Sequence, residues 1–155
     1  MIIAFHIILL CIIGGALGYL CLLSILASTT RASILQTTDN KYVFAVVVPA
    51  HNEELQIEKT VRQLRALEYP STHFDVLVVA DNCTDRTAEL ARAQGALVLE
   101  RVSTNRRGKG HTLRWCFDQI LGPGSKYDAV LVCDADTLAD HGLLRVMSSY
   151  LEQGD

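Results

Sequence analysis

Two carboxylates, Asp134 and Asp136, directly follow a short apolar run within the sequence Asp128-Ala-Val-Leu-Val-Cys-Asp-Ala-Asp-Thr137. Such a run is typical of a strand buried on both faces. Because side chains alternate along an extended chain, both carboxylates are expected on the same side. Two anions held so close repel each other unless a cation or a hydrogen-bond donor lies between them. Carboxylate oxygens suit Mg²⁺ or Mn²⁺, which leave positions open for phosphate oxygens. The alternative is a solvated strand end that caps the next helix.

The elements that must position these carboxylates alternate along the chain from residue 42 onward. Apolar runs predict strands at 42–48, 74–80, 96–100 and 128–133, the first ending at Pro49, which cannot donate to a sheet ladder. Helical spacing of apolar residues predicts helices at 54–67, 85–94, 113–121 and 141–151. This alternation implies right-handed crossovers and an α/β fold with a mainly parallel sheet and flanking helices.

Open parallel sheets bind ligands at the carboxyl ends of their strands. Three predicted strand ends carry polar groups, namely residues 49–54, 81–87 and 134–136. The Gly-rich turn of a dinucleotide fold is absent from the sequence. Gly108-Lys109-Gly110 also lacks the upstream glycine and the following Ser or Thr of a P-loop. The sequence therefore disfavours these two nucleotide-binding classes.

A basic loop lies between the third and fourth predicted strands and contains Arg101, Arg106, Arg107 and Lys109. Together with its two glycines, this loop suits an anionic phosphate group near the start of a helix. A run of this kind can also be ordinary solvated surface. Because it is expected to face the two acidic side chains, we interpret it as a clamp for a diphosphate.

Other polar residues have less specific interpretations. His51 and His111 match no metal-binding spacing, so they are expected to line the crevice or to satisfy polar neighbours. Thr84 or Asp85 is expected to cap the following helix, and Asp140 the last helix. No remaining acidic residue is an obvious general base, although Asp118 lies near the apolar face of the third helix.

Charge is distributed unevenly along the 155 residues, which are 50% hydrophobic and carry a formal net charge of -3. Residues 1–30 contain no Asp, Glu, Lys or Arg. The slightly acidic remainder argues against nucleic acid as a partner. The five cysteines contain no C-x-x-C pair, which indicates buried small hydrophobic residues in a reducing compartment.

The N-terminal segment is long and apolar enough to be a transmembrane anchor, predicted at residues 1–28 and followed by a linker at 29–41 and a domain at 42–155. A cleaved signal peptide is the alternative, but the segment lacks a positive N-terminal region. Arg31 and Lys41 follow the helix, so the positive-inside tendency places the domain on the cytoplasmic side of the cell membrane.

Four motifs occur in an order that resembles the nucleotide-sugar half of family 2 glycosyltransferases. They are Val47-Val-Pro-Ala-His-Asn-Glu-Glu54, Asp81-Asn-Cys-Thr-Asp85, Arg107-Gly-Lys-Gly110 and Asp134-Ala-Asp136. This GT-A-fold family includes cellulose, hyaluronan and poly-N-acetylglucosamine synthases. The resemblance implies a UDP-sugar donor, Mg²⁺ or Mn²⁺, an inverting transfer, and a glycan or lipid acceptor at the membrane.

The resemblance also implies roles for single residues. Pro49, Ala50, Asn52 and Glu53 would surround the uridine together with Asp81. Lys109 would lie near the base or the phosphates, with Arg107 also binding the donor. Asp134 would point toward the ribose and Asp136 toward the metal.

Two family features cannot be placed in this sequence, namely the carboxylate general base and the Gln-x-x-Arg-Trp motif of the polymer synthases. We therefore expect this chain to hold the donor half of the enzyme, with the base beyond Asp155 and little or no transfer by the chain alone. One alternative is a non-catalytic glycosyltransferase-like partner module at the membrane. Another is a metal-dependent nucleotidyltransferase built on a similar sheet.

Overall fold

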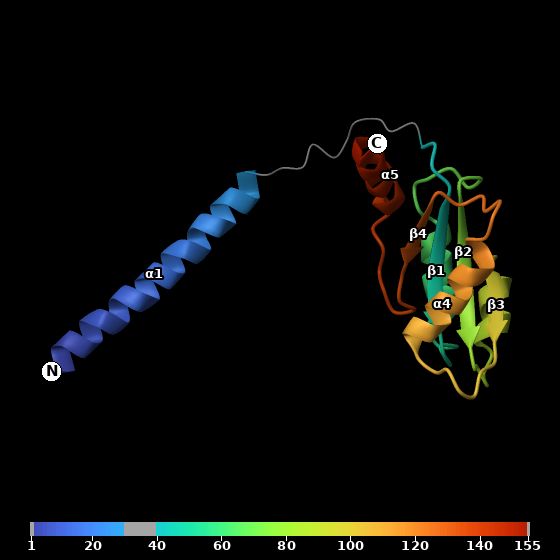
Figure 1. Cartoon of the computed structure of the whole chain (residues 1–155), viewed down its shortest axis with the longest axis horizontal. Helices are drawn as coiled ribbons and strands as arrows, with labels where there is room; N and C mark the ends of the chain where they lie inside the picture. The colour runs from blue at the N-terminus through green and yellow to red at the C-terminus, as the bar shows by residue number, and fades with distance from the viewer. Residues whose placement is uncertain (1, 30–39, 155) are drawn as a thin grey trace. The chain divides into compact units, whose positions relative to one another are not determined.

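The computed structural model describes residues 2–29 and 40–154 (Figure 1). It divides into two units, one containing helix α1 and the other containing all the strands and the remaining helices. Each unit is considered by itself. Most of the linker predicted at 29–41, including Arg31, lies outside the described residues.

Helix α1 (Ile2–Thr29) agrees with the helix predicted for the N-terminal segment. Residues 3–26 form a stretch of 24 residues with a mean hydropathy of 2.5. A helix needs about 20 apolar residues to cross the hydrocarbon layer of a bilayer. By length and composition α1 meets this requirement, which a signal sequence can also meet.

The domain is built on a four-stranded sheet in the order β3-β2-β1-β4, with every neighbouring pair parallel. Its strands are β1 (Phe44–Ala50), β2 (Phe74–Asp81), β3 (Leu97–Arg101) and β4 (Ala129–Val132). All four predicted strands and their parallel arrangement are therefore confirmed, with ends that differ by one or two residues. The apolar run of β1 is almost wholly buried because β1 lies in the middle of the sheet.

The end of β1 differs from the prediction, because the strand continues through Pro49. The carbonyl of Val47 accepts a hydrogen bond from the amide of Cys133 at 3.0 Å, so alternate residues of β1 face β4, and Pro49 belongs to this set. The pairing of β1 with β4 ends at Val47. Pro49 therefore extends the strand without removing a ladder hydrogen bond that the sheet requires.

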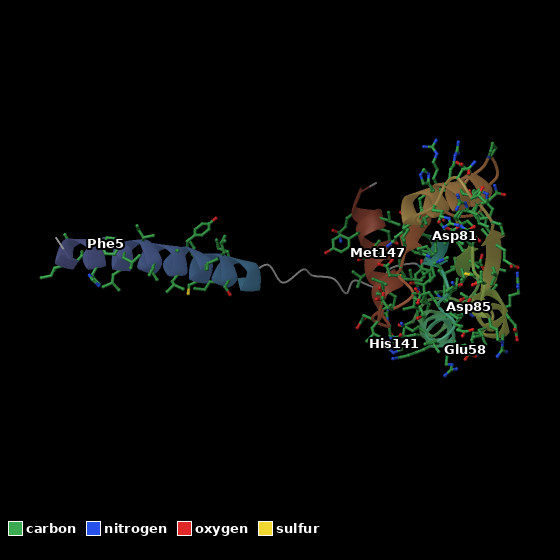
Figure 2. All side chains as sticks on the ribbon, turned by 90° about the horizontal axis from the view of Figure 1, so that it is seen from below. Phe5, Glu58, Asp81, Asp85, His141 and Met147 are labelled. Atoms are coloured by element: carbon green, nitrogen blue, oxygen red, sulfur yellow. The ribbon has the colours of Figure 1, made fainter. Side chains whose placement is uncertain are left out.

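Helices cover both faces of the sheet. They are α2 (Ile57–Arg65), α3 (Thr87–Ala93), α4 (Lys109–Ile120) and α5 (Leu143–Gly154). Helix α4 packs on one face, whereas α2, α3 and α5 contribute to the core on the other face (Figure 2). The predicted helices are confirmed, but α2, α3 and α5 begin two or three residues later than expected and α4 begins four residues earlier. Loop contacts before α2 and α3, described below, account for the late starts of these two helices.

Leu64 on α2 offers a test of this core, because only 1% of its surface is exposed. Leu64→Ala should lower the free energy of unfolding by about 2–5 kcal/mol, through lost apolar burial and the cavity left behind. Urea unfolding of the full chain in detergent, followed by tryptophan fluorescence, measures this change. Leu55→Ala is the matched control, since Leu55 is 93% exposed and should change stability by less than about 0.5 kcal/mol. Equal losses for the two variants would contradict the packing of α2.

Candidate functional site

A cavity of about 540 Å³ opens at the carboxyl ends of the strands. The eight residues to which the family resemblance gave a donor-binding role all line it: Pro49, Ala50, Asn52, Glu53, Asp81, Arg107, Lys109 and Asp134. Five further residues complete the lining: His51, Asn82, Thr84, Gly108 and Thr112. The structure thus brings together four segments that are far apart in the sequence, within 49–53, 81–84 and 107–112 and at Asp134.

Asp81, the last residue of β2, is the most constrained acidic group of the cavity, with only 8% of its surface exposed. Its Oδ1 accepts hydrogen bonds from Arg101 Nη1 at 2.6 Å and Asn82 Nδ2 at 2.9 Å, and its Oδ2 accepts one from Thr112 Oγ1 at 2.6 Å. A buried carboxylate is tolerated only when it is paired in this way. In Figure 2, Asp81 lies on the α4 side of the domain and Asp85 on the α2 side.

Arg101 corrects one sequence interpretation. It was grouped with the basic loop that binds a diphosphate, but it is the last residue of β3 and is only 6% exposed. Its guanidinium pairs with Asp81 and also donates to the carbonyl of Arg106 at 2.6 Å. Arg101 is therefore a structural cation, and Arg106 does not line the cavity. Only Arg107 and Lys109 of the predicted clamp do so.

Asparagine side chains join the loop after β2 to the loop after β1 and to the loop after β3. Asn52 Oδ1 accepts a hydrogen bond from the amide of Thr84 at 2.8 Å, and Asn82 Oδ1 accepts one from the amide of Ser103 at 2.8 Å. Both asparagines have positive φ, 56° for Asn52 and 51° for Asn82, a conformation that asparagine adopts more readily than most residues. His51 Nδ1 lies 2.6 Å from the carbonyl of Asp81, which confirms the crevice-lining, polar role expected for this histidine.

Contacts outside the cavity explain the late starts of α2 and α3. The amide of Glu54 donates to Asp85 Oδ2 at 3.1 Å, and Glu54 Oε2 accepts from the amide of Arg86 at 3.1 Å. Asp85 Oδ1 accepts from the amide of Thr87 at 3.0 Å, so Asp85 supplies the predicted capping bond although Arg86 occupies the N-cap position. Desolvation raises the pKa of Asp85, but the hydrogen bonds from Thr87 and Glu54 outweigh it and hold that pKa below its usual range.

Helix α4 begins at the cavity, with Gly108 as its N-cap residue. Gly108 has φ of 107°, which residues with a Cβ rarely adopt, and its carbonyl accepts the amides of His111 and Thr112. Lys109, the first residue of α4, forms an ion pair with Asp134. Both side chains are about half exposed, 52% and 53%, so water screens this pair and it can exchange for another partner.

Asp136 is exposed but does not line the cavity, and it lies in a turn after the end of β4. Ala135 between the two aspartates is 6% exposed, but β4 ends at Val132 and only Asp134 lines the cavity, so the expected placement of both carboxylates on one side stays a prediction. Among the residues that the structure describes, no group of three or more His, Cys, Asp or Glu could hold a metal ion. Two exposed carboxylates fit a Mg²⁺ or Mn²⁺ ion that also takes phosphate oxygens, rather than a cage made by protein alone.

Some cavity residues had no predicted binding role. Asn82 and Thr84 lie within a strand-end motif that the sequence does show, so their proximity to the cavity follows from the topology. Nothing in the sequence indicates that Thr112 lines the cavity, because only the packing of α4 brings its hydroxyl to Asp81.

These features define a nucleotide-binding type of α/β domain, with a polar cavity at the carboxyl ends of parallel strands. The family model described as Glycosyl transferase family 2 matches residues 45–155. The chain therefore belongs to the family 2 glycosyltransferases, as its motifs predicted.

Relatives agree with this assignment. The chain is 31% identical over 111 residues to the low-salt glycan biosynthesis hexosyltransferase Agl6 of Haloferax volcanii, covering 72% of this chain and 25% of that protein. It is 34% identical over 145 residues to the beta-monoglucosyldiacylglycerol synthase of Synechocystis sp., covering 88% of this chain and 29% of that protein. The chain thus spans between a quarter and a third of the length of these two relatives.

Solved structures show the same fold. A mannosyltransferase from Pyrobaculum calidifontis, in complex with GDP-Man and Mn²⁺, has a TM-score of 0.60 at 25% identity and covers 78% of this chain and 36% of its own. The glucosyl-3-phosphoglycerate synthase of Mycobacterium tuberculosis, in complex with Mn²⁺, UDP-Glc and phosphoglyceric acid, has a TM-score of 0.57 at 25% identity and covers 74% of this chain and 41% of its own. The predicted GT-A fold is confirmed.

The buried ion pair at the cavity gives a stability prediction. Arg101→Met should lower the free energy of unfolding by about 3–5 kcal/mol, because it leaves the Asp81 carboxylate buried without its cation. Urea unfolding of the full chain measures the loss. Arg92→Met is the control, since the ion pair of Arg92 with Glu100 is about half exposed and should contribute about 0–1 kcal/mol. A loss no larger than that of the control would show that Arg101 is not required to balance Asp81.

Proposed function

We propose that this chain binds the UDP-sugar of a membrane-anchored, inverting family 2 glycosyltransferase that transfers the sugar to a glycan or lipid acceptor. One observation carries the proposal: the eight residues to which the family resemblance gave a donor-binding role line a single cavity at the carboxyl ends of the strands. UDP is proposed as the nucleotide because the motifs resemble UDP-sugar enzymes and a structural neighbour is named as a complex with UDP-Glc. Another neighbour is named with GDP-Man, so the test below compares both nucleotides.

The proposed roles follow the chemistry of the cavity. Pro49, Ala50, Asn52, Glu53 and Asp81 form the wall for the uridine. Asp81 is held in place by Arg101 and Thr112, so it presents a fixed carboxylate edge.

The diphosphate would lie at the start of α4. Arg107 and Lys109 supply cationic charge there, and the helix N-terminus adds its partial positive charge. Lys109 can exchange Asp134 for a phosphate oxygen, because their ion pair is half exposed. Asp134 is then free to accept a hydrogen bond from the ribose.

Asp136 would hold Mg²⁺ or Mn²⁺ near Asp134. A bound divalent ion would stabilise the negative charge that develops on the departing diphosphate. Two structural neighbours are named as complexes with Mn²⁺, which supports this choice of metal.

The acceptor class rests on the relatives, which are named as a glycan hexosyltransferase and a glucosyldiacylglycerol synthase. The general base must remove a proton from the acceptor hydroxyl. Neither acid considered from the sequence suits this role. Asp118 on α4 does not line the donor cavity, and Asp140 accepts the amide of Gly142 at 2.8 Å in the turn before α5, close to the capping role expected for it.

Calorimetry of the full chain in detergent tests the donor site. UDP should bind in the presence of Mn²⁺, and Asp136→Ala should weaken this binding by about tenfold to a hundredfold, because a charged ligand contact is lost. Lys109→Ala should weaken UDP binding more than uridine binding, since uridine carries no phosphate. Glu89→Ala is the control, because Glu89 is an exposed carboxylate on α3 whose ion pair in the described part of the chain is with Arg86.

Unchanged UDP affinity in Asp136→Ala would remove the metal role of that residue. Tighter binding of GDP would replace UDP as the donor nucleotide. Displacement of UDP by a nucleoside triphosphate at lower concentration would favour nucleotidyl transfer over glycosyl transfer.

We also propose that α1 anchors the chain in the cell membrane with the domain on the cytoplasmic side. Alkaline carbonate washing should leave the chain in the membrane pellet, because a predominantly apolar stretch of 24 residues is long enough to span the bilayer. Leu10→Arg combined with Leu17→Arg should release it, since a charged residue at the centre of the span costs about 2.5–3.5 kcal/mol. In sealed inside-out vesicles, added protease should digest the domain. Protection of the domain would place it on the opposite side.

A further inference from the structure

A second cavity, of about 270 Å³, lies between α4 and the loop that follows β3. We call it the Arg114 pocket, and the residues used below are Ser103, Arg106, His111, Arg114, Trp115 and Asp118. No residue lines both this pocket and the donor cavity. The buried ion pair between Arg101 and Asp81 separates them, with Arg101 lining the pocket and Asp81 the cavity.

Helix α4 presents one continuous face to the pocket. His111, Arg114, Trp115 and Asp118 are spaced at i, i+3, i+4 and i+7, which places them on one side of a helix. The neighbouring face of α4 packs on the sheet through Cys116, and Trp115 is itself packed against that core. The Trp115 indole is therefore held in place by packing, whereas the side chains of Arg106, Arg114 and Asp118 are exposed.

The pocket is cationic in a chain of net charge -3. Residues 101–117 contain five Arg or Lys, one His, and no Asp or Glu. Within the described part of the chain, neither Arg106 nor Arg114 forms an ion pair. Arg101 is paired with Asp81, so the pocket retains two unpaired arginines, Arg106 and Arg114, against one carboxylate, Asp118, in the described contacts. This excess of cationic groups favours an anionic ligand.

The pocket also offers neutral hydrogen-bond donors. Ser103 Oγ accepts the amide of Arg106 at 3.3 Å, so its own proton remains available to a ligand. His111 can donate through its ring. Arginine forks and hydroxyls of this kind match the oxygens of a phosphate group.

We propose that the Arg114 pocket binds a phosphate monoester or a lipid phosphate headgroup, at a site separate from the donor cavity. Arg106 and Arg114 bind the phosphate oxygens with Ser103 and His111. Trp115 contacts the apolar part of the ligand, and Asp118 accepts a hydrogen bond from a hydroxyl group beside the phosphate. The volume suits a small phosphorylated alcohol, since sites for drug-sized ligands begin at about 300 Å³. This inference does not depend on the proposed donor function.

Trp115 makes the pocket directly observable, because it is the only tryptophan of the chain. The full chain in nanodiscs of neutral phosphatidylcholine is titrated with glycerol 3-phosphate, and with sodium chloride at matched ionic strength. The fluorescence of Trp115 should change saturably with the phosphate ester alone. Arg114→Gln should weaken this binding by about tenfold or more, because a charged hydrogen-bond partner is lost.

Two controls separate this site from the alternatives. Arg62→Gln removes an exposed arginine from α2, on the opposite face of the sheet, and should leave the titration unchanged. Saturating UDP with Mn²⁺ should also leave it unchanged. Loss of the signal with UDP would place the phosphate in the donor cavity and overturn the proposal, as would equal weakening by Arg62→Gln.

Nanodiscs that contain phosphatidylglycerol distinguish the two sources of phosphate. A Trp115 response to these discs that Arg114→Gln removes identifies a lipid headgroup, whereas a response to glycerol 3-phosphate alone identifies a soluble ester. Each result supports the site. No response to either probe, or responses that survive the combination of Arg106→Gln and Arg114→Gln, would overturn it. Circular dichroism spectra and urea unfolding midpoints equal to those of the unchanged chain show that these variants are folded.

Discussion

The buried ion pair between Asp81 and Arg101 is the interaction on which the functional end of the domain depends. These residues face each other in register at the ends of β2 and β3, and both are more than nine-tenths buried. Removing two charges from water is costly, and their attraction compensates only when further hydrogen bonds fix the geometry. Thr112 and Asn82 supply those bonds to Asp81, and the Arg106 carbonyl accepts one from Arg101. A single pair therefore joins the sheet edge, α4 and the loop between them.

The same ion pair lies between two cavities that differ in the charged groups that line them. On one side lies the donor cavity, where the cations Arg107 and Lys109 stand opposite the carboxylate of Asp134. On the other side lies the Arg114 pocket, where two arginines have no counter-charge among the described ion pairs. The proposed sugar transfer needs only the first environment. The second is a separate cationic surface within the same fold, formed by the outer face of α4.

Solvent exposure distinguishes the groups that hold the site together from those available to a ligand. Asp81 and Arg101 are buried and have several hydrogen-bond partners, so a ligand could replace one of these partners only by breaking several hydrogen bonds. Lys109 and Asp134 are half exposed and paired only with each other in the described contacts, so a phosphate can displace that pairing at little cost. The buried Asp81–Arg101 pair keeps the shape of the cavity fixed, whereas the exposed Lys109–Asp134 pair can open. This combination is suited to repeated binding and release of an anionic donor.

The order of strands and helices, the parallel sheet and the donor-lining segments could be predicted from the sequence alone. Apolar periodicity reflects burial, and parallel strands place their carboxyl ends at one edge. The course of β1 through Pro49 could not be predicted, because it depends on where the neighbouring β4 ends. Nor could the sequence distinguish Arg101 from Arg107 and Lys109 within one basic run. Only the packing of β3 beside β2 decides which cation is buried against Asp81 and which remain in solvent, because burial depends on neighbours that are distant along the chain.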